Sequence, residues 1–248
     1  MRKVVVYMGD WRIYDQMVTA AKSLLYHTQV DTIYFLIDTP YFPYHIPDTV
    51  ITVNVHNQKI FPVPGPNYHP HYGYMTWMRA ALSKILPHED VVLLLDPDTL
   101  VVDDISGLWD YDLSRHYLAA VEETRCGCGP SIHSKQPYFN AGVMLLNLER
   151  IRADKIDDTM IQTINTTHYK HLEQDVINYV CDRHILSLPS SYNTSFVTEL
   201  TTHPRIRHFL STAKKEWPEF AAPYERMTWN EIMQKGANAS CQEKPSLT

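Results

Sequence analysis

The sequence lacks the features of an exported or membrane-anchored protein. No segment approaches the roughly 18 consecutive apolar residues that a membrane-spanning helix needs. The first residues, MRKVVVYMGDW, lack the apolar stretch and the cleavage site of a signal peptide. We therefore expect a cytoplasmic protein without a stable membrane anchor, in which the N-x-S/T triplets at Asn165, Asn193 and Asn238 are chance matches.

Cysteine is also scarce, and its spacing does not indicate a zinc or redox site. Cys126 and Cys128 are closer together than the usual zinc or redox pair, and no second pair follows at zinc-finger spacing. We interpret this segment as a loop with small residues. His69 and His71 form a His-x-His pair, but a proline-broken segment without a nearby carboxylate is a poor metal site.

The sequence also has no excess of positively charged residues. The chain has 22 lysine and arginine residues against 28 aspartate and glutamate residues, a formal net charge of -6 at pH 7. Such a chain has no general attraction for nucleic acid or for an anionic membrane, so any anionic ligand must be held by a local site. Its hydrophobic content of 44% fits a globular protein with a substantial core.

Strand and helix patterns alternate along the chain. Strands are expected at residues 3–8, 32–38, 50–55, 90–96, 117–121 and 142–148, and helices at residues 14–28, 75–86, about 150–165 and 173–182. This alternation predicts an α/β fold with a mostly parallel central sheet. We expect one domain over residues 1–235, followed by a small, polar and poorly ordered tail at residues 236–248.

The apolar strand that ends in LLL, residues 93–95, runs directly into two carboxylates. Asp96 and Asp98 are two residues apart, so an extended backbone points both side chains to the same face. Two like charges this close need a cation, and Mg²⁺ and Mn²⁺ take oxygen ligands of this kind. For an isolated Asp-x-Asp pair, an ordinary acidic turn remains the alternative. Asp103 and Asp104 are assigned to a solvated turn or a helix N-cap.

Four segments together carry a family resemblance: LLLDPDTLVVDDISGLWDYDL at 93–113, YFNAGVMLLNLERIR at 138–152, LEQDVIN at 172–178 and RHFLSTAKKEW at 207–217. They resemble glycosyltransferase family 8, in the order of that family. The family includes bacterial lipooligosaccharide galactosyltransferases and glycogenin. The resemblance implies the GT-A fold, which is the Rossmann-like fold of nucleotide-diphospho-sugar transferases, and a retaining transfer reaction.

The resemblance also implies a metal site and a diphosphate site. Asp96, Asp98 and His208 would coordinate Mn²⁺ or Mg²⁺, and the imidazole favours Mn²⁺. Lys214 would bind the diphosphate as a point charge, with Lys215 as the adjacent competitor. At residue 211 a serine replaces the usual glycine of the family, and its Cβ would weaken the approach of the diphosphate.

Further donor contacts follow from the same resemblance. Asp10 would contact the nucleoside, and Tyr14 would stack on uracil, with Trp11 as the second candidate. Arg79 would reach the donor from a helix, where a surface salt bridge is the ordinary alternative. Asn140 would bind a donor-sugar hydroxyl, in a segment whose small Ala141 and Gly142 let the sugar approach the chain.

The segment LEQDVIN carries the catalytic assignments. Gln174 would lie near the anomeric carbon, and because an amide is a poor nucleophile it favours a front-face route of retention. Glu173 stands where many relatives have aspartate, which affects the choice between glucose and galactose. Asp175 would either bind a sugar hydroxyl or cap the helix that begins here.

Together these features predict a metal-dependent retaining hexosyltransferase. It would move glucose or galactose from a UDP-sugar to an unidentified acceptor, a glycan or a protein, with an α-linkage. The alternatives are a non-catalytic sugar-nucleotide-binding protein and, less favoured, a metal-dependent phosphohydrolase, which would normally add ligands for a second metal. Acceptor contacts are expected from residues 122–137 and beyond Trp217.

Overall fold

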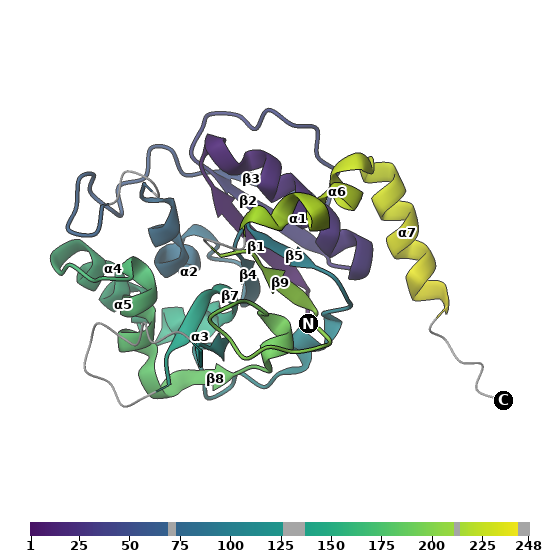
Figure 1. The fold of residues 1–248 in the computed structure, drawn as a ribbon. Helices are drawn as coiled ribbons and strands as arrows, with labels where there is room; N and C mark the ends of the chain where they lie inside the picture. The colour runs from purple at the N-terminus through teal and green to yellow at the C-terminus, as the bar shows by residue number, and fades with distance from the viewer. Residues whose placement is uncertain (69–72, 126–136, 211–213, 243–248) are drawn as a thin grey trace.

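The computed structural model describes residues 1–68, 73–125, 137–210 and 214–242, with side chains described up to residue 235. Its centre is a seven-stranded sheet in the order β3-β2-β1-β4-β7-β6-β8 (Figure 1). The strands are β1 Val4–Gly9, β2 Thr32–Ile37, β3 Val50–Asn54, β4 Val91–Leu95, β6 Leu118–Glu122, β7 Phe139–Asn147 and β8 Ile185–Ser187.

The sheet is parallel except at one strand. β1 pairs parallel with β2 and β4, β2 pairs parallel with β3, and β6 pairs parallel with β8. β7 runs antiparallel to both of its neighbours, β4 and β6. The prediction of a single α/β domain with a mostly parallel sheet is therefore confirmed.

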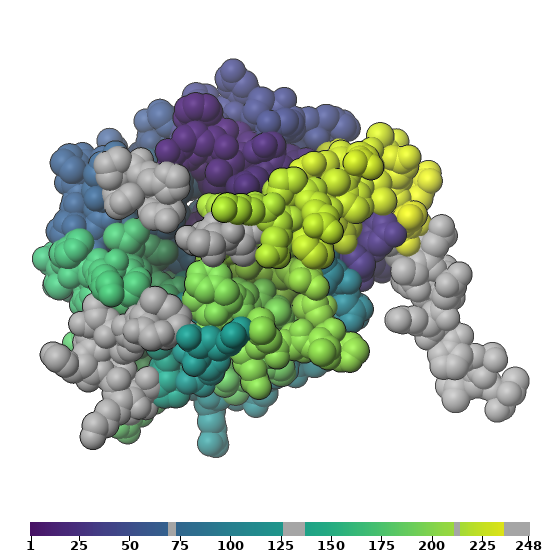
Figure 2. All heavy atoms as spheres, in the orientation of Figure 1, coloured from purple at the N-terminus to yellow at the C-terminus, as the bar shows by residue number. Residues whose placement is uncertain are grey.

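Helices cover both faces of this sheet. The α-helices are α1 Tyr14–His27, α2 Leu82–Ile85, α3 Leu148–Ala153, α4 Ile156–Thr166, α5 Leu172–Cys181, α6 Trp217–Arg226 and α7 Trp229–Gln242, and the 3₁₀ segments are η1 Trp11–Ile13, η2 Met75–Ala81, η3 Ser106–Asp110, η4 Asp182–His184 and η5 Ser190–Tyr192. α6 and α7 pack on α1, and Figure 2 shows their yellow surface against the purple N-terminal part. No helix in the described part of the chain is long and apolar enough to cross a membrane.

Strand β4 separates the two halves of the core. Leu93 and Leu95 point into the cluster that contains α1, α6 and α7, while Val92 and Leu94 point into the cluster that contains η2, α4 and α5. All four side chains are fully buried. Each buried leucine contributes about 1.5–3 kcal/mol of stability relative to an exposed one. This two-sided burial explains why the strand is apolar at every position.

A separate two-stranded ribbon lies beside the end of β4. β5, Thr99–Val101, pairs antiparallel with β9, Ile206–His208, and Thr99 lies opposite His208 in this register. The ribbon therefore brings a distant histidine next to the two carboxylates that follow β4.

Three predicted elements differ from the structure. The segment 75–86 is mostly 3₁₀ helix, since Met75–Ala81 are 3₁₀ and only Leu82–Ile85 are α-helical, and Arg79 within it donates to the Ala141 carbonyl. The predicted helix at 150–165 is two helices, α3 and α4, separated at Lys155, which has a left-handed φ of 55°. The predicted domain boundary after residue 235 falls inside α7, while residues 243–248 of the predicted tail lie outside the described residues.

Candidate active site

Two carboxylates and one imidazole meet at the end of β4. His208 Nε2 lies 3.2 Å from Asp98 Oδ1 and 3.8 Å from Asp96 Oδ2. One ligand atom from each residue fits within 4.8 Å of the other two. The Nε2 atom is buried and makes no hydrogen bond of acceptable geometry. Two oxygen ligands and a nitrogen atom without a hydrogen-bond partner fit a divalent cation, so the geometry agrees with the metal site expected from the sequence.

The electrostatics of this cluster are those of tightly packed opposite charges. Burial alone would raise the pKa of Asp98, but the charge of His208, and then Lys214, holds it below the ordinary value. Burial would lower the pKa of His208, but Asp98 and Asp96 outweigh it and raise that pKa. A bound cation would compete with a proton for His208 Nε2.

Arg79 joins the acidic pair to helix α5. Its side chain is 6% exposed, and Nη2 donates to Asp96 Oδ1 at 3.0 Å while Nε lies 3.3 Å from Glu173 Oε1. Nη1 donates to the carbonyl of Ala141 at 2.7 Å. Burial raises the pKa of Glu173, although Arg79 opposes the shift. Arg79 therefore orients Asp96 through a buried ion pair. The alternative considered from the sequence, a salt bridge on the surface, does not describe this contact.

A hydrogen-bonded group surrounds Gln174. Its Oε1 accepts from the Ala141 N–H at 2.9 Å, and its Nε2 donates to Glu123 Oε1 at 3.2 Å and to Tyr138 Oη at 3.1 Å. Asn140 Nδ2 donates to the same Glu123 oxygen at 2.8 Å. The structure thus brings the predicted Asn140 and Gln174 together through a carboxylate that the sequence did not indicate.

Asp175 is occupied by structural contacts. It is 1% exposed, and its carboxylate accepts from Tyr138 Oη at 2.7 Å and from the His171 N–H at 2.9 Å. His171 is the N-cap residue of α5. Of the two roles predicted for Asp175, these contacts favour the one at the start of the helix.

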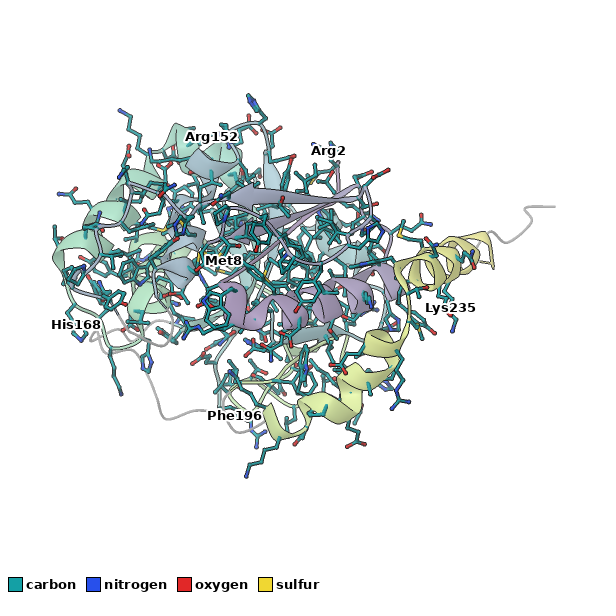
Figure 3. All side chains as sticks on the ribbon, turned by 90° about the horizontal axis from the view of Figure 1, so that it is seen from above. Arg2, Met8, Arg152, His168, Phe196 and Lys235 are labelled. Carbon is teal, nitrogen blue, oxygen red and sulfur yellow. The ribbon has the colours of Figure 1, made fainter. Side chains whose placement is uncertain are left out.

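A cavity of about 360 Å³ opens in front of the acidic pair. Its charged lining consists of Asp10, Arg12, Arg79, Asp96, Asp98 and Lys214. Figure 3 labels another lining residue, Met8, which lies at the end of β1 near the centre of the molecule. Lys214, and not the competing Lys215, lines this cavity.

A second, more open cleft shares Asp10 and Arg12 with the first. Its lining includes the aromatic side chains of Trp11, Phe61, Tyr68 and Tyr74. Together the two cavities run from a candidate metal site, past an arginine and a lysine, to an aromatic surface. That sequence of environments suits a ligand with a diphosphate at one end and a ring at the other.

The sequence model of Glycosyl transferase family 8 matches residues 15–219 of this chain. The chain belongs to glycosyltransferase family 8. Glycosyltransferase GlyE of Streptococcus pneumoniae serotype 4 is 28% identical over 255 residues, which cover 92% of this chain and 60% of GlyE. Glycosyltransferase GlyA of the same bacterium is 26% identical over 92% of this chain and 34% of GlyA. The chain therefore spans only part of the length of these family 8 relatives.

Solved structures of two glycosyltransferases share the fold. The crystal structure of GlyE superposes with a TM-score of 0.73 at 24% identity, covering 100% of this chain and 66% of that one. The galactosyltransferase LgtC, solved with donor and acceptor sugar analogues, gives a TM-score of 0.68 at 20% identity, covering 94% of this chain and 99% of that one. The expected GT-A fold is thereby confirmed for this family 8 chain.

Tyr14 cannot be the stacking residue of this family 8 protein. It is 1% exposed, and its hydroxyl bonds to Asp38 Oδ1 at 3.0 Å and to Thr39 Oγ1 at 2.9 Å, while its ring packs on Phe42. The prediction was wrong because Tyr14 begins α1 and faces the core. Trp11, the second candidate, is 69% exposed and lines the aromatic cleft.

Gly142 makes room for a side chain and not for a sugar. A Cβ at this position would lie 2.1 Å from Cε1 of His208 and 2.7 Å from its Nδ1. The expectation that Gly142 lets a sugar approach the chain is therefore corrected, because the imidazole of His208 fills that space. The glycine of the family 8 FNAG segment here allows the histidine to reach the acidic pair.

Two more of the acidic residues considered from the sequence make contacts with residues close to them in the chain. Asp10 lines both cavities and is paired with the Arg12 guanidinium. Asp104 accepts hydrogen bonds from Ser106 at the start of η3, as the turn assignment predicts. The cysteine and histidine pairs considered as metal sites, together with the serine near His208, lie outside the described residues: Cys126, Cys128, His69, His71 and Ser211.

Proposed function

We propose that this protein is a metal-dependent retaining hexosyltransferase. It would transfer glucose or galactose from a UDP-sugar to an unidentified glycan or protein acceptor, forming an α-linkage. The observation that carries the proposal is the cluster of Asp96, Asp98 and His208 at a cavity that Lys214 also lines. Membership of glycosyltransferase family 8 supports the transfer chemistry.

Each group has a task in this reaction. Asp96, Asp98 and His208 would hold Mn²⁺ or Mg²⁺, and the bound ion would offset the charge that develops on the departing diphosphate. Lys214 adds a further positive charge for the same phosphate oxygens. Arg79 keeps Asp96 oriented through their 3.0 Å hydrogen bond. The aromatic cleft beyond Asp10 and Arg12 would take the nucleoside.

The sugar end of the site supports a front-face route. Gln174 is held by the Ala141 N–H and by Glu123, and an amide in this arrangement is a poor nucleophile. In the proposed reaction its carbonyl oxygen would instead stabilise the positive charge that develops on the anomeric carbon. The leaving diphosphate and the incoming hydroxyl would then occupy the same face of the sugar, which retains its configuration.

Gln174→Ala is expected to lower kcat by roughly 10²-fold while changing KM much less, because its partner is the developing transition state. Initial rates over a range of donor concentrations measure both constants. Gln162→Ala, on the exposed surface of α4, is the matched control and should leave both unchanged. A normal kcat in the Gln174 variant would mean that another residue lies beside the anomeric carbon.

Thermal unfolding with a panel of ligands tests the proposed donor. UDP-glucose, UDP-galactose, UDP-GlcNAc, UDP, GDP-mannose and ATP are each added with Mn²⁺, with Mg²⁺ or with EDTA. A ligand at 100 times its Kd adds about 2.7 kcal/mol of stability, so a shift in Tm is expected with UDP species and metal and should disappear with EDTA. No shift with any UDP species would contradict the proposal. Binding without turnover would favour a sugar-nucleotide-binding protein.

A further inference from the structure

Asn193 lies between the candidate metal site and the candidate sugar site. It follows η5, its side chain is fully buried, and both ends of its amide are used. Its Nδ2 donates to Asn140 Oδ1 at 2.9 Å, and its Oδ1 lies 3.0 Å from His208 Nδ1. A buried amide with one partner in each site is placed to control both.

The direction of these hydrogen bonds is fixed by their surroundings. Asn140 Oδ1 also receives the backbone N–H of Gly142 at 2.9 Å, and a backbone N–H can only donate. At its other end Asn140 donates to the carboxylate of Glu123 at 2.8 Å. Asn140 Oδ1 is therefore an acceptor, and Asn193 must present its NH₂ group to that atom.

The orientation of Asn193 in turn fixes the histidine. With its NH₂ group turned to Asn140, Asn193 presents its carbonyl oxygen to His208, so Nδ1 carries a proton. In neutral His208 the lone pair then lies on Nε2, the atom that faces Asp98 at 3.2 Å. The hydrogen-bond chain thus selects the tautomer that can bind a cation.

We infer that Asn193 is a positioning residue that serves both sites, holding His208 for the metal through its carbonyl oxygen and Asn140 for the donor sugar through its NH₂ group. The inference rests on the proposed function, because it takes the cluster of Asp96, Asp98 and His208 as a metal site. The buried Thr198, which closes the turn after Asn193, supports this role. Thr198 Oγ1 donates to the Asn193 carbonyl at 2.8 Å and receives the N–H of Ser195 at 3.0 Å.

Two substitutions separate the two bonds. Asn193→Ala removes both, so Mn²⁺ affinity should fall by about 10- to 100-fold. Asn193→Asp keeps an oxygen acceptor for His208 Nδ1–H but has no NH₂ group for Asn140, so Mn²⁺ affinity should stay within about threefold of the wild type. In that variant the added affinity of UDP-glucose or UDP-galactose over UDP should be lost. Free Mn²⁺, measured by its electron paramagnetic resonance signal during titration of the full chain, gives the metal affinity directly.

Matched variants distinguish positioning from a general loss of structure. Asn67 is 1% exposed and also uses its amide in three hydrogen bonds, two to the carbonyls of α4 and its end and one from the Tyr169 N–H. Asn67→Ala should lower Tm and leave Mn²⁺ affinity unchanged. If Asn193 acts through His208, then Asn193→Ala should weaken Mn²⁺ binding no further in a His208→Ala background.

The outcomes separate this inference from the proposed function. If wild-type protein binds Mn²⁺ and Asn193→Ala binds it equally well, the inference is overturned and the metal site stands. If Asn193→Ala and Asn193→Asp lose the same affinity, the carbonyl of Asn193 does not position His208, and the inference is likewise overturned. If the wild type binds no Mn²⁺ with or without UDP, the metal assignment fails, and the inference fails with it.

Discussion

Gly142→Ala is expected to abolish metal binding and to lower kcat/KM by at least about 10²-fold. The new methyl group would stand 2.1 Å from His208 Cε1, so the imidazole must leave its place beside Asp98. Mn²⁺ titration and initial rates measure the two effects. Such a large loss from one carbon atom is expected only where a side chain fills the space over a glycine.

Two controls accompany this variant. Gly107→Ala places its Cβ 3.5 Å from the Tyr192 hydroxyl, an ordinary contact, and should leave Mn²⁺ affinity unchanged. The clash should also lower the Tm of Gly142→Ala. Combining this change with His208→Ala removes the clash, so the double variant should regain the Tm of the wild type but not its metal binding. Retained Mn²⁺ affinity in the single variant would show that His208 is not a ligand.

Asp98→Asn is expected to lower metal-dependent turnover by roughly 10³-fold, the effect of losing several kcal/mol of charge stabilisation. The substitution keeps the shape of the side chain and removes the charge that lies 3.2 Å from His208 Nε2. The fold should survive, since the substitution keeps the size of the side chain and Asp98 is partly exposed, at 19%. Rates at saturating donor with Mn²⁺, together with circular dichroism, check both statements.

The matched control for this change is Asp103→Asn. Asp103 belongs to the same acidic run, but its side chain is 62% exposed and lies 4.0 Å from Arg205, where a surface pair contributes little. The activity of the Asp103→Asn variant should equal that of the wild type. Full activity of Asp98→Asn would instead remove this carboxylate from the metal site.

The sequence predicts the parts of the fold and site that depend on local patterns. Strand β4 and its two carboxylates follow from an apolar run and a period of two. The assignment of Tyr14 to uracil stacking was wrong, although the sequence contained a signal against it. Tyr14, Met17, Ala21 and Leu24 share one helical face, and all four are buried.

Glu123 and Asn193 could not be predicted in the same way. Glu123 follows β6 without a recognisable motif, and its hydrogen-bond partner Gln174 lies 51 residues later on α5. Asn193 stands in a loop, where its N-x-S/T triplet was interpreted as a chance match to a glycosylation signal. Its two hydrogen-bond partners lie on β7 and β9. Long-range pairing brings these residues together, and a single sequence carries no periodicity that reports it.

The pairing of Thr99 with His208 in the β5–β9 ribbon has a consequence for biosynthesis. A ribosome delivers both carboxylates long before the histidine, so a partly synthesised chain has an acidic pair without its third ligand. The ribbon can close only after residue 208 has left the exit tunnel, and it must then close a long loop. Catalytic competence would therefore be acquired only after β9 has been made, and a chain interrupted between β8 and β9 would carry all seven strands of the central sheet without His208.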